Sequence, residues 1–78
     1  MPTIFEIGPF RIIIRTRDHL PAHVHCRCPD GEVLIEIESL KVIRNHGVHL
    51  SDVRRLKVFV SEKREVLMNE WEHFHGKD

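Results

Sequence analysis

The sequence predicts an α+β fold: a small antiparallel sheet of two β-hairpins, with four or five strands, covered on one face by a long C-terminal helix. Three observations lead to this prediction. Apolar and polar residues alternate with a period of two on both sides of two turn signals, Gly8-Pro9 and Pro29-Asp30-Gly31. From residue 53 onwards the apolar residues recur every three or four positions, which is the period of a helix with one buried side. A sheet and a helix that each have one apolar side bury both by packing together.

The first hairpin is predicted around the Gly8-Pro9 turn. Its period-two apolar set is Phe5, Ile7, Phe10, Ile12 and Ile14. Glycine can adopt the positive φ of the first central position of a type II′ turn, and proline suits the second. This turn predicts three pairs on one face: Ile7 with Phe10, Phe5 with Ile12, and Thr3 with Ile14. A slip by one residue would move the apolar set to the other face, so the pattern specifies the register.

The second hairpin is predicted from two alternating runs, residues 23–28 and 33–38. A two-residue Asp30-Gly31 loop and a four-residue loop from Pro29 to Glu32 give the same register. The longer loop is favoured because Pro29 has no N–H to donate to the sheet. That register pairs Cys26 with Ile35 and Val24 with Ile37 in the core. On the opposite face it pairs His25 with Glu36 and His23 with Glu38.

The remaining chain is predicted to be a short strand or turn over residues 40–50 and then a helix. Ser51 is a suitable N-cap, and Asp52 suits the first helical turn. An apolar stripe follows, and Gly76 ends it: Val53, Leu56, Val60, Leu67, Trp71 and Phe74. We therefore expect a single domain over residues 1–78, with the β-sheet part in 1–49 and the C-terminal helix in 50–76.

The composition is that of a small globular domain. The chain has 78 residues, of which 41% are hydrophobic, and its formal net charge is zero, so no global field draws it to nucleic acid. Its apolar runs are shorter than the ~20 residues of a membrane helix, and Met1–Phe5 lacks the basic start of a signal peptide. We expect a cytoplasmic protein with no membrane contact. Because so short a chain buries only about 60–65% of its unfolded surface, a homodimer or a partner protein would add stability.

Candidate functional residues gather on the sheet face turned away from the helix. His23 and His25 share this face because positions i and i+2 of a strand point the same way, and His19 lies just before them. Imidazoles transfer protons or bind metals near neutral pH. Three further residues would support them, with Arg27 stabilising an anion and Glu36 and Glu38 orienting the rings. The alternative is a set of solvated cross-strand pairs, each worth about 0.2–1 kcal/mol.

No cofactor is predicted, although a divalent metal remains an alternative. It would be held by His19, His23 and His25, with Glu36 as a further candidate ligand. A zinc site that joins Cys26 and Cys28 to these histidines is excluded because alternate strand positions point to opposite faces.

A second candidate site is basic. Arg54, Arg55 and Lys57 lie near the predicted helix start, which attracts anions, and Arg15 is a further candidate for binding phosphate. A solvated helix face is the alternative interpretation.

The chain also resembles a known bacterial family. The resemblance rests on Met1-Pro2-Thr3-Ile4, Asp18-His19-x-Pro21-x-His23-Val24-His25, Pro29-Asp30-Gly31, Asn45-x-Gly47 and Trp71. These segments are similar to those of the domain of unknown function 4160 family, in which a second proline often stands at the position of Ala22. Members of that family are often encoded beside a small partner of the domain of unknown function 2442 family. The resemblance therefore implies a toxin–antitoxin module with an antitoxin-like partner, and a suspected site at His19, His23 and His25.

The leading hypothesis is a toxin-type component that acts on RNA. His23 and His25 would serve as acid and base. Arg27 and Arg15 would hold the phosphate, and His19 would complete the site. Glu36 and Glu38 would orient the imidazole rings.

Two further hypotheses remain open. One is a non-enzymatic regulatory module that binds protein or nucleic acid, and the other is a small His-x-His metal-binding protein. The sequence does not decide between an enzyme and a binding module.

Overall fold

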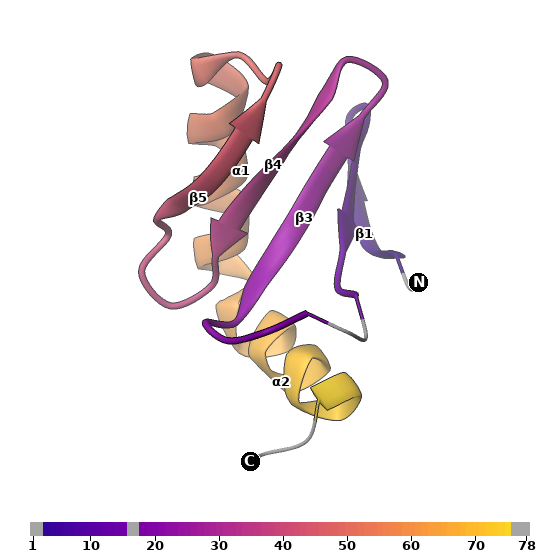
Figure 1. Ribbon diagram of the computed structural model, residues 1–78, viewed down its shortest axis with the longest axis vertical. Coiled ribbons are helices and arrows are strands. Elements are labelled where there is room, and N and C mark those ends of the chain that lie inside the picture. The colour runs from indigo at the N-terminus through magenta and orange to yellow at the C-terminus, as the bar shows by residue number, and fades with distance from the viewer. Residues whose placement is uncertain (1–2, 16–17, 76–78) are drawn as a thin grey trace.

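The computed structural model describes residues 3–15 and 18–75. Five antiparallel strands follow one another in chain order across one sheet, and two helices follow the last strand (Figure 1). The elements are β1 (Thr3–Ile7), β2 (Phe10–Ile13), β3 (His23–Cys28), β4 (Gly31–Glu36), β5 (Val42–His46), α1 (Leu50–Glu62) and α2 (Arg64–His75). The predicted α+β class with an antiparallel sheet is confirmed.

The first hairpin has the predicted two-residue turn. Gly8 has a φ of 56°, and Ile7 pairs with Phe10. The register then shifts between Thr3 and Phe5, so that Thr3 pairs with Ile13. The predicted pairing of Thr3 with Ile14 is therefore wrong, because an irregularity in β1 takes up one residue.

The second hairpin has a tighter turn than predicted. Cys28 pairs with Gly31, which leaves Pro29 and Asp30 as a two-residue loop. Proline fits here because the first central position of a turn needs a φ near −65° and no N–H. The predicted register is wrong by two residues, and the observed pairs are His23 with Glu36, Val24 with Ile35, His25 with Leu34, Cys26 with Val33, and Arg27 with Glu32. A shift of two residues keeps every side chain on its predicted face.

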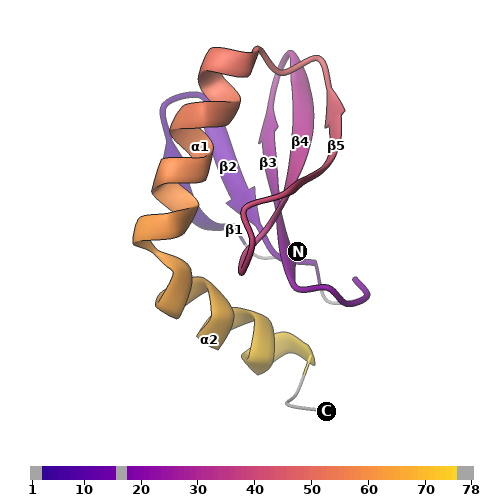
Figure 2. The same cartoon turned by 90° about the vertical axis from the view of Figure 1, so that its left-hand side faces the viewer.

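The predicted C-terminal helix is divided into two. Helix α1 begins at Leu50, and its N-cap is His49 rather than the predicted Ser51. The helical backbone breaks at Lys63. Lys63 is also the polar gap in the apolar stripe. The break changes the direction of the chain, so that α1 lies along one face of the sheet and α2 passes the end of the sheet where β3 begins (Figure 2). The predicted helix end at Gly76 lies outside the described residues.

The core lies between α1 and the sheet. Its fully buried side chains from the sheet region include Ile12, Ile14, Val24, Cys26, Val33, Ile35 and Ile37. Of the predicted stripe, Val53, Leu56, Val60, Leu67 and Trp71 are buried, whereas Phe74 is only partly buried against the core. Burying one such Val, Leu or Ile side chain stabilises the fold by about 1.5–3 kcal/mol. Within residues 3–15 and 18–75, no helix is long and apolar enough to cross a membrane.

Candidate functional site

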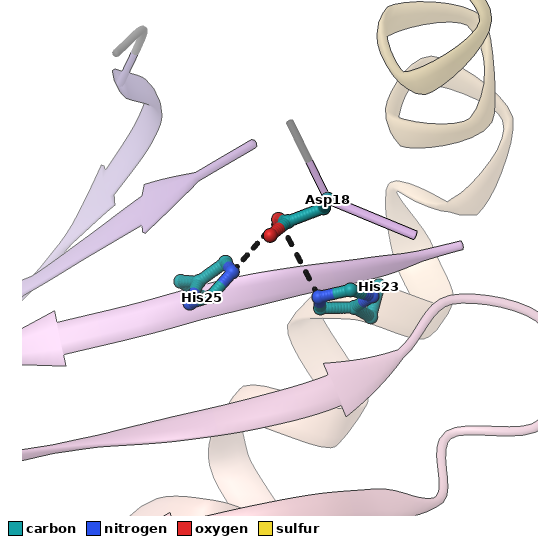
Figure 3. Close-up of side chains that lie close together, drawn as sticks. All are labelled: Asp18, His23 and His25. Carbon is teal, nitrogen blue, oxygen red and sulfur yellow. Dashed lines mark hydrogen bonds and ion pairs between the residues drawn. The ribbon is translucent and has the colours of Figure 1, made fainter. Parts of the chain in front are cut away.

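A cluster of polar side chains lies on the open face of the sheet, which we define as the face that carries Arg11, His23, His25, Arg27 and Glu32. Helix α1 packs on the other face. Asp18, from the segment that leads into β3, reaches over the open face toward the rings of His23 and His25 (Figure 3). The two histidines are only 8% and 4% exposed. The structure therefore brings one carboxylate and two imidazoles together in a partly enclosed site.

His25 lies between two carboxylates. Its Nδ1 is 3.1 Å from Glu32 Oε2, and its Nε2 is 2.8 Å from Asp18 Oδ2. An ionised carboxylate only accepts hydrogen bonds, so a neutral ring donates to one of the two, from Nδ1 to Glu32 or from Nε2 to Asp18, and only the imidazolium form donates to both. With the proton on Nδ1, Nε2 presents a lone pair to a cation between the two side chains.

His23 is oriented by the backbone. Its Nδ1 is 2.8 Å from the carbonyl oxygen of Pro21, and because a carbonyl only accepts, Nδ1–H is the donor. The Leu20–Pro21 peptide bond is cis. The other ring nitrogen, Nε2, lies 3.4 Å from the Asp18 Oδ2 atom that His25 also contacts. Trp71 of α2 packs beside the ring, with 5.5 Å between the ring centroids.

The charges of the cluster leave room for one more cation. Arg15 contacts Glu32, with 3.2 Å between Nη2 and Oε2. Among the described residues, the carboxylates of Asp18 and Glu32 thus face one permanent positive charge, which leaves a net charge of one negative on this set when both imidazoles are neutral. A charge that is largely withdrawn from water needs a partner. A cation bound at the imidazole nitrogens would supply one.

The ligand atoms of the cluster lie close enough together to hold a metal ion. Those of Asp18, His23 and His25 lie within 4.8 Å of one another. Two atoms bound at about 2.1 Å with a tetrahedral angle lie about 3.4 Å apart. His23 Nε2 and Asp18 Oδ2 have this separation, whereas His25 Nε2 and Asp18 Oδ2 are 2.8 Å apart and would have to separate around an ion. His23 donates its Nδ1 proton to the carbonyl of Pro21, the Nδ1 of His25 faces Glu32, and both rings turn Nε2 toward Asp18. Outer acceptors of this kind fix the tautomer and orientation of most metal-binding histidines.

Three predicted members of the histidine site do not belong to the cluster of Asp18, His23 and His25. His19 is exposed, although it is next to Asp18 in the chain. Glu36 pairs with His23 in the strand register, but its carboxylate accepts a hydrogen bond from Ser39 at 2.7 Å. Glu38 is exposed in the turn after β4, so the predicted pairing of His23 with Glu38 is wrong.

The predicted arginines divide between the two sides of the molecule. Arg27 is exposed on the open face, two positions beyond His25 on the same strand. Arg54, Arg55 and Lys57 belong to α1, on the helix side, and Arg55 contacts Asp52 at 2.6 Å. The basic residues of α1 therefore take no part in the histidine cluster.

The cysteines are separated from the cluster, as predicted. Cys26 is fully buried in the core on the helix side, and burial there raises the pKa of its thiol from 9.0 to about 12. A protonated thiol is a poor metal ligand because the thiolate is the binding form. Cys28 is partly buried and, like Cys26, is a free thiol.

Two residues of the cluster were not predicted as site residues. Asp18 belongs to the quoted family segment, and a carboxylate just ahead of a histidine-bearing strand was the available signal. Glu32 would have been found from the observed turn, since a loop of Pro29-Asp30 places Glu32 opposite Arg27 and diagonal to His25.

Comparison with known proteins gives one match. The family model of a domain of unknown function, DUF4160, matches residues 10–72 of the chain. No curated protein matches, and neither does any solved structure.

Proposed function

The chain belongs to the DUF4160 family, whose description assigns no activity, and from the geometry of its site we propose that it binds a divalent transition-metal ion through Asp18, His23 and His25. One observation carries the proposal. The Nε2 atoms of both histidines converge on one oxygen of Asp18, while the two Nδ1 atoms are held by Pro21 and Glu32.

The ligand set favours certain metals. Imidazole nitrogen suits zinc, nickel, copper and iron, whereas magnesium and calcium prefer sites made of oxygen alone. Two histidines and one carboxylate also occupy only three positions around the ion. A fourth position would remain for water or a small ligand, as in zinc sites that bind substrates.

The same cluster can also exist without metal, with a proton on His25 between its two carboxylates. A metal ion would replace that proton, because it needs the Nε2 lone pair. Protonation and metal binding therefore compete for the same nitrogen, and the two states are distinguished by direct titration with metal.

We expect the chelator-treated, untagged protein to bind one zinc ion per chain in a calorimetric titration. His23→Ala and His25→Ala should each weaken binding at least about 100-fold, since even outer-sphere partners contribute about 10–100-fold. His19→Ala is the matched control, because it removes an exposed histidine next to the site. It should leave the affinity within about twofold. Equal losses in His19→Ala and His23→Ala would contradict the proposed ligand set.

A second candidate function is the toxin-type role that the family resemblance implies, with action on RNA and an antitoxin-like partner protein. What supports it is a histidine pair whose ring centroids are 5.2 Å apart, with Arg27 exposed on the same strand face. Acid–base cleavage of RNA uses two such groups near neutral pH. The burial of both rings favours the metal site, because an RNA phosphate would have to displace the segment that carries Asp18.

Growth of bacterial cells after induction tests this second role. The wild type should arrest growth, and a soluble, equally abundant His23→Ala/His25→Ala double variant should not. Arrest by both proteins would remove the histidines from the toxic activity. RNA cleavage that persists in excess chelator would favour acid–base roles over the metal site.

A further inference from the structure

A second polar site lies beyond the histidine cluster on the open face, at the end of the sheet where the two hairpins turn. Arg11 of β2 and Arg27 of β3 are directly opposite each other in the strand register, and both are exposed. They line an open hollow of about 370 Å³ together with Pro9, Cys28 and Pro29. Small-molecule sites occupy about 300–1,000 Å³.

The pairing of the two arginines is unfavourable by itself. Like charges at directly opposed positions of neighbouring strands destabilise a sheet. Among the described residues, no ion pair or side-chain hydrogen bond involves either Arg11 or Arg27.

Within the described part of the chain, the acidic residues opposite the two arginines form no ion pair with them. Glu6 is opposite Arg11 in the register but forms no ion pair with it, and Glu32 is opposite Arg27. The Oε2 atom of Glu32 contacts Arg15 and His25 instead. The histidine cluster thus takes up the carboxylate that would otherwise offset Arg27.

We infer that Arg11 and Arg27 together bind a phosphate group. Guanidinium groups match phosphate oxygens with paired hydrogen bonds, and a phosphate dianion would offset both charges at once. Pro9 and Pro29, one from each turn, line the same hollow. This inference does not rest on the proposed metal site, since neither arginine belongs to it.

The phosphate can come from a free nucleotide or from a nucleic-acid strand. AMP, adenosine and a single-stranded RNA oligonucleotide are the probes, each titrated into ¹⁵N-labelled full-length protein in the presence of chelator. AMP should shift backbone resonances next to the hollow, and inorganic phosphate should displace it. Tighter binding of the oligonucleotide than of AMP, with a strong dependence on salt, would identify a nucleic-acid strand as the source. Binding of AMP alone would identify a nucleotide.

Arg11→Gln and Arg27→Gln should each weaken AMP binding at least about tenfold, because each removes one charge-assisted contact. Lys41→Gln is the matched control. It removes one positive charge from an exposed position between β4 and β5, and it should leave the affinity within about twofold. The inference is wrong if AMP causes no shifts, if adenosine binds as well as AMP, or if Lys41→Gln weakens binding as much as the other two variants. Loss of AMP binding would leave zinc binding unaffected, so the two proposals fail separately.

Discussion

The Gly31→Ala variant should be largely unfolded at room temperature. Gly31 begins β4, and a Cβ atom there would overlap the carbonyl oxygen of His46 and lie 3.0 Å from its carbonyl carbon. It would also lie 3.1 Å from the carbonyl carbon of Gly47. All three are backbone atoms, so no flexible side chain can move aside. Overpacking costs about 1–3 kcal/mol or more, and a domain of this size has only a few kcal/mol of stability.

Gly8→Ala is the control for this prediction. Gly8 has a φ of +56°, but a Cβ atom there would have nothing within 4 Å. The variant should lose only about 1–2 kcal/mol, the cost of a left-handed backbone at an alanine. Urea unfolding, followed by circular dichroism, compares the two. If both variants unfold at the same urea concentration, the close approach of the β5 backbone is not the reason why position 31 needs glycine.

Asp18→Asn should remove zinc binding, with a loss of at least about 100-fold in affinity. The change keeps the size of the side chain and removes the charge that both histidines share. In the metal-free protein it should also lower the free energy of unfolding by about 2 kcal/mol, since hydrogen bonds to charged groups contribute about 1.5–3 kcal/mol. Calorimetric titration and urea unfolding measure the two effects.

Asp30→Asn is the control for Asp18→Asn, because it makes the same chemical change outside the site. Asp30 is exposed in the turn between β3 and β4. Its replacement should change neither the zinc affinity nor the stability by more than about 0.5 kcal/mol. An Asp18→Asn protein that binds zinc as tightly as the Asp30→Asn protein would show that Asp18 is not a ligand.

The face on which each strand residue lies follows from the strand period, whereas its cross-strand partners do not. His23, His25 and Arg27 lie on the predicted face, and Val24 and Cys26 lie in the core. The partners depend on which residues form the turn. Pro29 was excluded from a ladder position for its missing N–H, yet in the turn itself that N–H is not needed.

The site depends on contacts that no local pattern encodes. Asp18 lies ahead of β3, and its carboxylate reaches the two histidines through a tertiary contact. Trp71 reaches His23 only because the helix breaks at Lys63. The stripe of buried residues was predicted correctly on both sides of that break, since one apolar side serves two short helices as well as one long helix.

X-ray absorption at the zinc edge, on untagged full-length protein loaded with one equivalent of zinc, tests the metal site most directly. We expect a shell of nitrogen and oxygen at about 2.0–2.1 Å with the scattering pattern of two imidazoles, and no sulfur at about 2.3 Å. The Asp18→Asn protein should not yield this spectrum. A sulfur shell would contradict the site by bringing in Cys26 or Cys28, and a spectrum with fewer than two imidazoles would show that His23 and His25 do not bind the ion together.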